Sequence, residues 1–284
     1  MLTAAEALRR AKQRLRDAGV PDAALDAEAL LRHVLGWDRA AVLARAGEPL
    51  PGADEERFFA LVDQRAGRRP LQHITGTQAF WRHEFVVTPA VLIPRPETEV
   101  LVEAALEMLR GVHAPVVVDV GTGSGCVALS LAAERPDAVV HAVDASAAAL
   151  AVAGENMRRL GLQGRVELHE GDLLEPVARL RGAVHLVVSN PPYVDPSEIP
   201  SLAPEVRDYE PHAALLAPDP PYGIYERLAA QAVQTLRPGG RLLVEVGRGM
   251  ADDVAARLSA AGLVGIETSP DLAGVARVVS GRRP

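Results

Sequence analysis

The stretch Val184-His-Leu-Val-Val-Ser-Asn-Pro-Pro-Tyr193 joins an apolar run directly to an asparagine, two prolines and a tyrosine. The apolar run predicts a fully buried strand over residues 184–189. Each proline lacks an N–H and fixes its own φ, so the strand ends at Asn190, which the next proline holds in an extended conformation. This pattern predicts a rigid corner that presents an amide, two carbonyl groups and an aromatic ring at the carboxyl end of a strand, where open α/β sheets bind ligands.

The composition indicates a globular chain of one large or two modest domains. Of its 284 residues, 48% are hydrophobic and 24% are charged. No apolar run reaches the roughly 18 residues of a membrane span, and the first predicted helix is charged and amphipathic, unlike a signal peptide. We therefore expect a soluble, cytoplasmic protein.

Cysteine and histidine usage gives no sign of a disulfide or a metal site. Cys126 is the single cysteine, and its Ala/Leu-rich surroundings predict a small buried thiol. The eight histidines are scattered and none pairs at metal-ligand spacing. His141 and His185 fall inside predicted strands, where packing is a more common role than catalysis. No metal is expected.

The charge of the chain is distributed unevenly. The net charge is −7, and residues 1–70 contain a slight excess of basic residues, so the acidic excess lies in the remainder. An acidic excess over most of the chain argues against binding a long stretch of phosphate backbone there. Direct binding of nucleic acid is therefore not expected.

Residues 1–70 predict a helical N-terminal domain. Thr3 and Glu6 form a capping-box pattern, and Gly36 is placed to end the second helix. Residues 71–95 are rich in Thr, Phe, Trp and Val with turn residues, which predicts a β-hairpin linker. The helices expected in the first domain begin near residues 3, 22, 38 and 54.

Residues 96–284 predict the catalytic domain, an α/β, doubly wound and mostly parallel seven-stranded sheet. Alternating strands and helices require parallel pairing with right-handed crossovers. The last two strands are joined by a turn too short for a crossover, so they must pair antiparallel. This combination resembles the fold of S-adenosylmethionine-dependent methyltransferases. Strands are expected over 116–120, 138–143, 165–169, 184–189, 240–246, 263–268 and 275–280, and helices near 97–110, 124–134, 147–160, 222–236 and 250–261.

The segment Leu92-Ile-Pro-Arg-Pro-Glu-Thr-Glu99 is stiff because it contains two prolines. Two interpretations are open. In the first, the prolines only mark the boundary before a helix, and Glu97 in its first turn interacts favourably with the helix dipole. Alternatively, the segment is a rigid wall over a ligand site.

A glycine-rich turn follows the first strand of the catalytic domain. Glycines let the backbone turn tightly and approach a ligand closely, with helix N–H groups behind them. Cys126 stands where a dinucleotide fingerprint needs its third glycine, and a Gly-Lys-Ser/Thr sequence is absent, which excludes a P-loop. The residues of the turn are Gly121, Thr122, Gly123, Ser124 and Gly125.

Acidic residues follow the next two strands. Asp144 can accept hydrogen bonds from both hydroxyls of a ribose, although capping of the following helix is an alternative. In Glu170-Gly171-Asp172-Leu173, an acid can accept a hydrogen bond from an adenine amino group. The arrangement suits a nucleoside without phosphate, and a sulfonium cation would favour acidic surroundings such as Asp119.

The corner at Asn190, Pro191, Pro192 and Tyr193 suits methyl transfer to a planar NH₂ group. The lone pair of such a nitrogen is delocalised and weakly nucleophilic. The Asn190 side-chain oxygen and the Pro191 carbonyl can accept from the NH₂, orient its lone pair and stabilise the positive charge that develops. Tyr193 supplies an aromatic face. A neutral asparagine suffices because the proton can leave after the methyl group arrives.

The chain resembles the release factor N5-glutamine methyltransferases (PrmC/HemK family) over almost its full length. The motifs concerned are Gln72-His-Ile-Thr-Gly76, Leu92–Glu99, Gly121–Gly125, Asn190–Tyr193 and Gly274–Val279. The resemblance implies methylation of the glutamine in the Gly-Gly-Gln loop of peptide chain release factors. It implies S-adenosyl-L-methionine as cofactor and a substrate-recognition role for residues 1–70. Gly121–Gly125, Asp144, Asp172, Leu173 and Asn190 would bind the cofactor, and Asn190–Tyr193 the glutamine.

Two positions depart from the family pattern. Leu173 stands where some relatives carry a large aromatic residue, which removes a stacking partner for adenine, and Ala276 replaces a polar residue before Arg277.

Other functions remain open from the residues alone. The same Asn-Pro-Pro-Tyr pattern occurs in adenine-N6 methyltransferases of nucleic acids, and a binding module that senses the cofactor is a non-enzymatic alternative. We expect a monomer. The acidic loop over residues 195–210 suggests docking of basic residues around the substrate loop, or simply a solvated surface.

Overall fold

The computed structural model describes residues 1–217 and 222–284, and it divides the chain into two compact units. The helical unit comprises Met1–Thr77 with Ala203–Tyr209. The catalytic unit comprises Gln78–Leu202 with Glu210–Pro284. The chain therefore leaves the catalytic unit once, soon after the Asn-Pro-Pro-Tyr corner, and adds one short segment to the helical unit.

The helical unit is held by caps and an apolar core. Thr3 and Glu6 form the predicted capping box, and Gly36 ends the second helix in the left-handed conformation. Leu15, Leu30 and Phe58 are fully buried in its core. Its helices are α1 (Ala4–Asp17), α2 (Ala23–Leu35), α3 (Arg39–Ala44), α4 (Gly52–Ala66), α5 (Leu71–Thr75) and α9 (Pro204–Arg207).

The predicted hairpin is present but shorter than residues 71–95. It consists of β1 (Thr77–Phe80) and β2 (His83–Val86), and the rings of Phe80 and Phe85 pack edge to face. The first residues of the expected linker form helix α5 instead. Pro70 precedes this helix and Gly76 ends it in the left-handed conformation, which are common helix boundaries.

The catalytic unit contains the predicted seven-stranded sheet. Its strand order is β5-β4-β3-β6-β7-β9-β8, with β7, β9 and β8 pairing antiparallel and the other neighbours parallel. The order reverses between β3 and β6, which is the point where such sheets bind ligands. The strands are β3 (Val116–Val120), β4 (Val139–Asp144), β5 (Val166–Glu170), β6 (Val184–Ser189), β7 (Leu236–Glu245), β8 (Val264–Pro270) and β9 (Ala276–Arg282).

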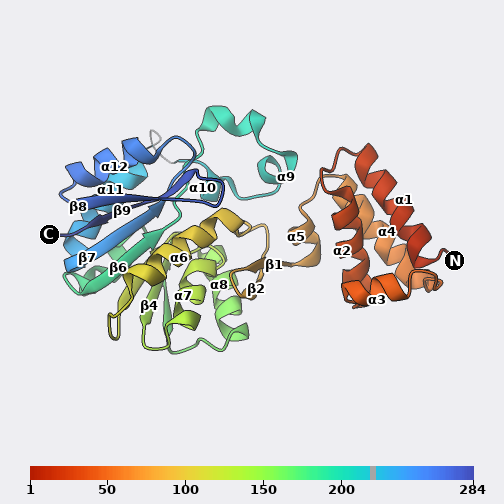
Figure 1. The fold of residues 1–284 in the computed structure, drawn as a ribbon, viewed down its shortest axis with the longest axis horizontal. Helices are drawn as coiled ribbons and strands as arrows, with labels where there is room; N and C mark the ends of the chain where they lie inside the picture. The colour runs from red at the N-terminus through yellow and green to blue at the C-terminus, as the bar shows by residue number, and fades with distance from the viewer. Residues whose placement is uncertain (218–221) are drawn as a thin grey trace. The chain divides into compact units, whose positions relative to one another are not determined.

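Helices cover both faces of this sheet (Figure 1). On one face, Tyr225 and Leu258 pack with Val118 and Val187 of the sheet. On the other face, Leu101 and Leu131 pack with Val117 and Leu186. These two valine and leucine residues precede Val118 and Val187 in the strands, so their side chains point to the opposite face of the sheet. The first face is covered by α11 (Gly223–Thr235) and α12 (Ala251–Ala260), and the second by α6 (Glu99–Met108), α7 (Cys126–Glu134) and α8 (Ala147–Arg159).

Several short elements were not predicted from the sequence. They are brief or proline-containing, so they show little hydrophobic periodicity. They are η1 (Pro96–Thr98), which precedes α6, with η2 (Glu175–Leu180), η3 (Pro196–Ser201) and α10 (His212–Leu215), in addition to α5 and α9.

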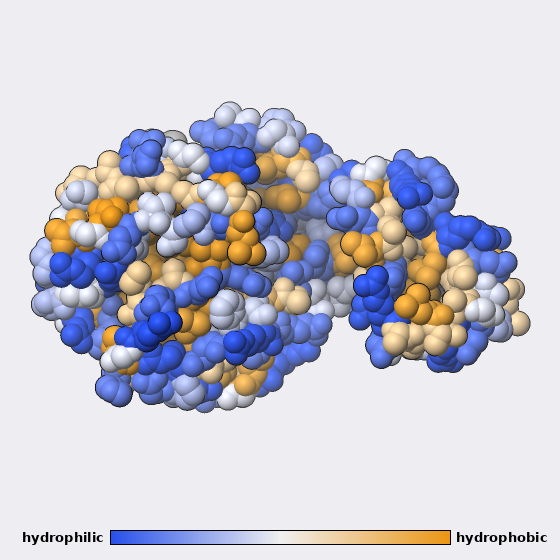
Figure 2. Space-filling model, viewed as in Figure 1, coloured by the Kyte–Doolittle hydropathy of each residue, from blue (hydrophilic) through white to orange (hydrophobic). Residues whose placement is uncertain are grey.

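The visible surface mixes hydrophobic and hydrophilic residues (Figure 2). Among the described residues, every helix is too short or too polar to cross a membrane.

Candidate active site

The catalytic unit contains a cavity of about 450 Å³ at the carboxyl ends of its parallel strands. This volume is suited to a small-molecule ligand. The turn after β3, the loops after β4 and β5 and the corner after β6 contribute to its wall, together with the segment before α6. The four regions singled out in the sequence as ligand-binding therefore meet at one cavity.

The glycine-rich turn forms the wall next to β3. Gly121, Thr122, Gly123 and Ser124 line the cavity, whereas Gly125 lies behind them. Gly125 has a φ of 82°, and a Cβ there would come within 2.9 Å of Leu129 Cδ1, so this position requires glycine. The Ser124 side chain is buried beneath the turn, next to Cys126.

Asp144 connects this turn to β4. Its Oδ2 accepts a hydrogen bond from the Gly123 N–H (2.8 Å), and its Oδ1 accepts one from the Ser146 N–H (2.9 Å). Ser146, rather than Asp144, caps helix α8 by accepting from the Ala149 N–H. Each carboxylate oxygen retains a lone pair, and Asp144 lines the cavity. Its geometry suits two vicinal hydroxyl groups.

The loop after β5 brings Asp172 and Leu173 to the same cavity. Asp172 forms an ion pair with Arg227 of α11, with a distance of 2.6 Å between Oδ2 and Nη1. Leu173 is buried with a φ of 48°, a conformation that non-glycine residues rarely adopt. Its apolar side chain forms part of the cavity wall.

Asp119, on β3, is buried behind the turn. The Thr122 hydroxyl donates to its Oδ2 (2.7 Å), and the Ala128 N–H donates to the same oxygen (3.2 Å). Burial raises the pKa of Asp119 to about 7, against the effect of these hydrogen bonds, and the nearby Asp144 adds to the rise. This group lines the cavity and contributes to its acidic character.

The proline corner forms the wall next to β6. Asn190, Pro191 and Pro192 line the cavity, whereas Tyr193 is not among the lining residues. Tyr193 packs against the core on the α11–α12 side, close to Gly247, and burial raises its pKa to about 12. The Ser189 hydroxyl donates to the Val120 carbonyl (2.8 Å), which ties the base of this corner to β3.

Two residues beside Asn190 were not predicted from the sequence. The Asn190 Nδ2 donates to the Thr98 hydroxyl (3.1 Å). Burial raises the pKa of Glu245 to about 7, and the influence of Thr98 opposes this rise. Glu245 is 2% exposed at the end of β7. The available signals were the Leu92–Glu99 pattern and an acid within the apolar run Leu242–Val246.

The Leu92–Glu99 segment is a wall of the cavity, as one of its two interpretations proposed. Leu92, Pro94, Arg95 and Thr98 line it. Glu210 holds the segment by accepting from the Ile93 N–H and pairing with the Arg95 guanidinium.

The structure refines the expectation for Cys126. The residue as a whole is partly exposed, because it lies at the start of α7 and lines the cavity, although its thiol is desolvated. Desolvation raises the pKa of its thiol to about 12, and the nearby Asp119 adds to this rise. A thiol with this pKa is neutral at physiological pH and is not activated as a nucleophile.

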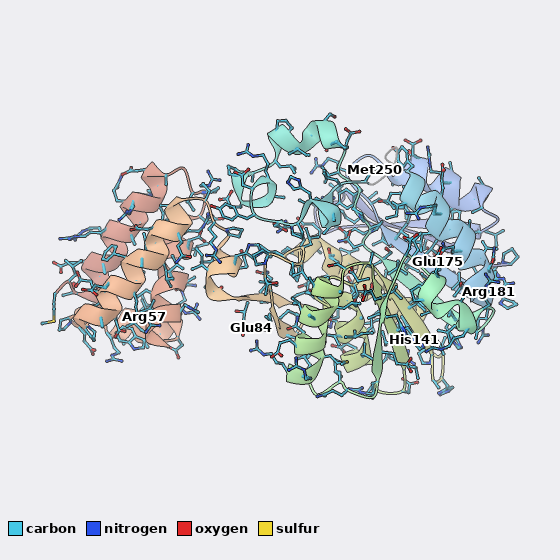
Figure 3. The ribbon with its side chains drawn as sticks, turned by 180° about the vertical axis from the view of Figure 1, so that it is seen from behind. Arg57, Glu84, His141, Glu175, Arg181 and Met250 are labelled. Atoms are coloured by element: carbon cyan, nitrogen blue, oxygen red, sulfur yellow. The ribbon has the colours of Figure 1, made fainter. Side chains whose placement is uncertain are left out.

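Two histidines that are far apart in the sequence meet in the fold. His141, labelled in Figure 3, lies on β4, and its Nδ1 is 3.0 Å from the Nε2 of His169 on β5. Glu167 completes a group of three side chains with metal-ligating atoms close together. However, Glu167 pairs with Arg179 at 2.7 Å, and burial lowers the pKa of both histidines. Hydrogen bonding and ion pairing account for this group.

Two acids of the loop over residues 195–210, Glu205 and Glu210, form ion pairs within the chain. Glu205 belongs to the helical unit and pairs with Arg65 and Arg68. Burial raises the pKa of Glu205, but hydrogen bonds from these arginines outweigh burial and lower it to about 2. Glu210 binds Arg95, so neither acid is available for a partner.

Comparison with known proteins gives a consistent result. A family model described as the PrmC N-terminal domain matches residues 6–76, and the methyltransferase small domain matches residues 96–205. A release factor glutamine methyltransferase from Cereibacter sphaeroides is 45% identical over 283 residues, which cover 100% of this chain and 99% of that relative. The chain belongs to the release factor glutamine methyltransferase family.

Two other members of this family show similar agreement. The enzyme from Geobacter sulfurreducens is 44% identical, with 94% of this chain and 92% of the relative covered. The enzyme from Burkholderia pseudomallei is 43% identical, with 92% of each covered. The similarity therefore includes both the helical unit and the catalytic unit, consistent with the predicted family and methyltransferase fold.

Proposed function

We propose that this protein transfers a methyl group from S-adenosyl-L-methionine to the side-chain amide nitrogen (N5) of the glutamine in the Gly-Gly-Gln motif of peptide chain release factors. The observation that carries the proposal is the Asn190 corner, which faces the same cavity as the glycine-rich turn and Asp144. One wall is suited to a nucleoside and the other to a planar NH₂ group. Family membership supports this choice of substrate.

The residues present fit the proposed cofactor. Among the described residues that line the cavity, the cations Arg95 and Arg227 are each paired with a carboxylate. The site therefore offers no free cation there for a phosphate, and it offers the carboxylate of Asp144 for ribose hydroxyls. When bound, S-adenosyl-L-methionine supplies an electrophilic methyl group on a sulfonium.

The remaining cofactor contacts follow from the cavity wall. Gly121, Thr122, Gly123 and Ser124 would flank the methionine part, with Gly125 supporting the turn from behind. Asp172 and Leu173 would lie beside adenine, the first as an acceptor and the second as an apolar contact. Asn190 would adjoin both the cofactor and the substrate.

The acceptor is activated by orientation rather than by a strong base. The Asn190 Oδ1 and the Pro191 carbonyl accept hydrogen bonds from the glutamine NH₂, which directs the nitrogen lone pair at the methyl group and stabilises the developing positive charge. Pro192 stiffens the corner, and Tyr193 supports it from the core side. The surplus proton leaves the nitrogen after transfer.

The cellular setting follows from the substrate. Release factors act in the cytoplasm, so we infer a cytoplasmic enzyme that acts as a monomer, with the helical unit contributing to release factor recognition. The helical unit is the part matched by the PrmC N-terminal model, which supports a role specific to this family.

Methyl-labelled cofactor and a purified bacterial release factor test the proposal. The expected result is label on the wild-type release factor and none on a matched release factor whose Gly-Gly-Gln glutamine is replaced by alanine. Equal labelling of the two release factors would contradict the proposed acceptor. Labelling of DNA or RNA adenine in place of the release factor would support the alternative function.

A further inference from the structure

Asn156 is a buried amide in the interior of α8, and it is not among the residues that line the cavity. Asparagine is a weak helix former, because its side chain competes with the backbone for hydrogen bonds. The residue is 1% exposed, so its polar atoms must find partners within the protein. Asn156 therefore contributes tertiary hydrogen bonds rather than helix stability.

The amide of Asn156 uses both its oxygen and its nitrogen. Oδ1 accepts from the Val86 N–H at 2.7 Å. Nδ2 donates to the Val86 carbonyl at 3.0 Å and to the Ser124 carbonyl at 2.9 Å. The reversed amide would place its oxygen against two carbonyl oxygens, so the hydrogen bonds select one orientation. One side chain thus joins the glycine-rich turn to the last residue of β2.

On the turn, Asn156 fixes the peptide between Ser124 and Gly125. The carbonyl of this peptide accepts from Asn156, and its N–H donates to the Thr122 carbonyl at 2.8 Å. Helix α8 also approaches closely here, because a Cβ on Gly125 would lie 3.3 Å from the Cβ of Ala153. Rotation of this peptide would break both hydrogen bonds. The cavity-facing part of the turn is therefore supported from behind by α8.

Beyond β2, the chain runs along α8 into the cavity wall, and residues 90–92 line the cavity. Asn156 holds the start of this segment through the backbone of Val86. Glu210 holds its far end by an ion pair with Arg95. The part between packs on α8 through an apolar cluster of Val87, Val91, Ala149 and Val152. Loss of Asn156 should therefore release the turn and the start of the wall segment, but not its far end.

We propose that Asn156 is a positioning residue for the cofactor, which holds the glycine-rich turn and the segment after β2 in place before S-adenosyl-L-methionine binds. It acts through the backbone of Ser124 and Val86 and need not touch the cofactor. Preorganised walls raise affinity, because the conformational entropy is lost on folding rather than on binding. The inference rests on the proposed function, which assigns the glycine-rich turn to the cofactor.

The experiment compares N156L, N156D and N156S with the parent enzyme. Leucine keeps the approximate shape of asparagine without its polar groups, and aspartate keeps only the acceptor for the Val86 N–H. We expect Kd for S-adenosyl-L-methionine to rise by about tenfold in N156L and N156D, because buried carbonyl groups lose their donor. N156S leaves room for a bridging water, so its Kd should rise by only about threefold. Calorimetry measures these values.

Kinetics separate positioning from a general loss of stability. In all three variants, kcat and the KM for the release factor at saturating cofactor should stay within about threefold. The reason is that the proline corner and the far end of the wall segment keep their own anchors, at Ser189 and Glu210.

T235V is the matched control. It removes a buried hydroxyl that donates to the Gln231 carbonyl of α11 at 2.9 Å. This variant should lower the urea concentration at the midpoint of unfolding and leave the cofactor Kd at the parental value. Parental Kd in N156L and N156D would overturn the inference, and so would an equal rise of Kd in T235V or a loss confined to kcat. If N156L fails to fold, N156D and N156S decide the question by the same measurements.

Calorimetry on the parent enzyme separates this inference from the proposed function. If the parent binds S-adenosyl-L-methionine without methylating the release factor, the proposed acceptor is contradicted, while a tenfold rise of Kd in N156D still supports the positioning role. Methyl transfer by the parent together with parental Kd in the Asn156 variants contradicts the positioning role alone.

Discussion

The turns after the neighbouring strands β3 and β6 both line the cavity, but they are built from residues with opposite effects on the backbone. After β3 the chain turns through glycines, and after β6 it turns through prolines. The two turns approach each other, since a Cβ on Gly121 would lie 3.9 Å from the Asn190 carbonyl oxygen. Glycine permits left-handed backbone and close approach, whereas proline removes N–H donors and leaves rigid carbonyl acceptors.

The two turns are also tied to different neighbours. The N–H groups of Gly121 and Thr122 both donate to the Val143 carbonyl, and Gly123 donates to Asp144, so the glycine turn is anchored to the β4 side. The proline corner is anchored through Ser189 to β3 and through Asn190 to Thr98. The comparison teaches that changes in the glycine turn should alter cofactor binding, while changes in the proline corner should alter methyl transfer.

The largest expected effect comes from the proline corner. N190A removes an acceptor that acts on the reacting nitrogen, so we expect kcat to fall by about 10²–10³ while the cofactor Kd stays within about threefold. Steady-state kinetics and calorimetry measure the two quantities. Q163A removes an amide from an exposed position and should match the parent in both. A large loss of cofactor affinity in N190A would contradict the proposal that the proline corner acts on methyl transfer and the glycine turn on cofactor binding.

On the opposite side, D144N should weaken cofactor binding. Loss of the carboxylate charge weakens hydrogen bonds to ribose hydroxyls, so we expect Kd to rise by about tenfold with little change in kcat at saturation. The measurement is calorimetry followed by kinetics at saturating cofactor. D252N removes the same charge from an exposed position on α12 and serves as the control. If D144N bound the cofactor as tightly as the parent enzyme, Asp144 would not have the proposed role in binding the ribose.

The glycine turn itself is tested by a matched pair of alanine variants. Gly125 and Gly111 have similar φ values, 82° and 76°, but only Gly125 would place its Cβ 2.9 Å from Leu129. We expect both variants to be destabilised by strain of about 1 kcal/mol, and G125A by about 1–2 kcal/mol more because of crowding. Urea unfolding measures this difference. Equal destabilisation would show that crowding at Gly125 is relieved without cost.

The smallest effect is expected at Asp172. This acid is already paired with Arg227, and both side chains are nearly half exposed, so the interaction is screened by solvent. D172N should therefore change the cofactor Kd by no more than about threefold, less than D144N. Calorimetry at low and high salt measures it. A loss larger than that of D144N would reverse the assigned importance of the two acids.

Much of the fold follows from the sequence because its strands are sharply bounded. The predicted limits 116–120 and 184–189 agree with β3 and β6, because Gly121 follows the first strand and Pro191 comes two residues after the second. The sequence does not predict helix α5, because its five residues are too few to show a helical period. Short elements such as η3 lack enough residues to show a period.

The candidate site was predictable only where each residue lies in a local motif. Asn190 and Asp144 stand at strand ends that the sequence marks clearly. Thr98 reaches Asn190 from 92 positions away, and the buried Glu245 arrives from a third segment. Such partners depend on tertiary packing, which composition and periodicity do not specify. The engagement of Glu205 within the helical unit was hidden from the sequence for the same reason.

The most direct test of the central claim is a competition experiment with mass-spectrometric site mapping. The enzyme and S-adenosyl-L-methionine are incubated with a release factor and with adenine-containing DNA and RNA in one reaction. The account predicts one added methyl group on the side-chain amide of the Gly-Gly-Gln glutamine and unmodified nucleic acid, with N190A strongly reducing this product. Methylation of adenine with an unmodified glutamine, or full product formation by N190A, would contradict the account.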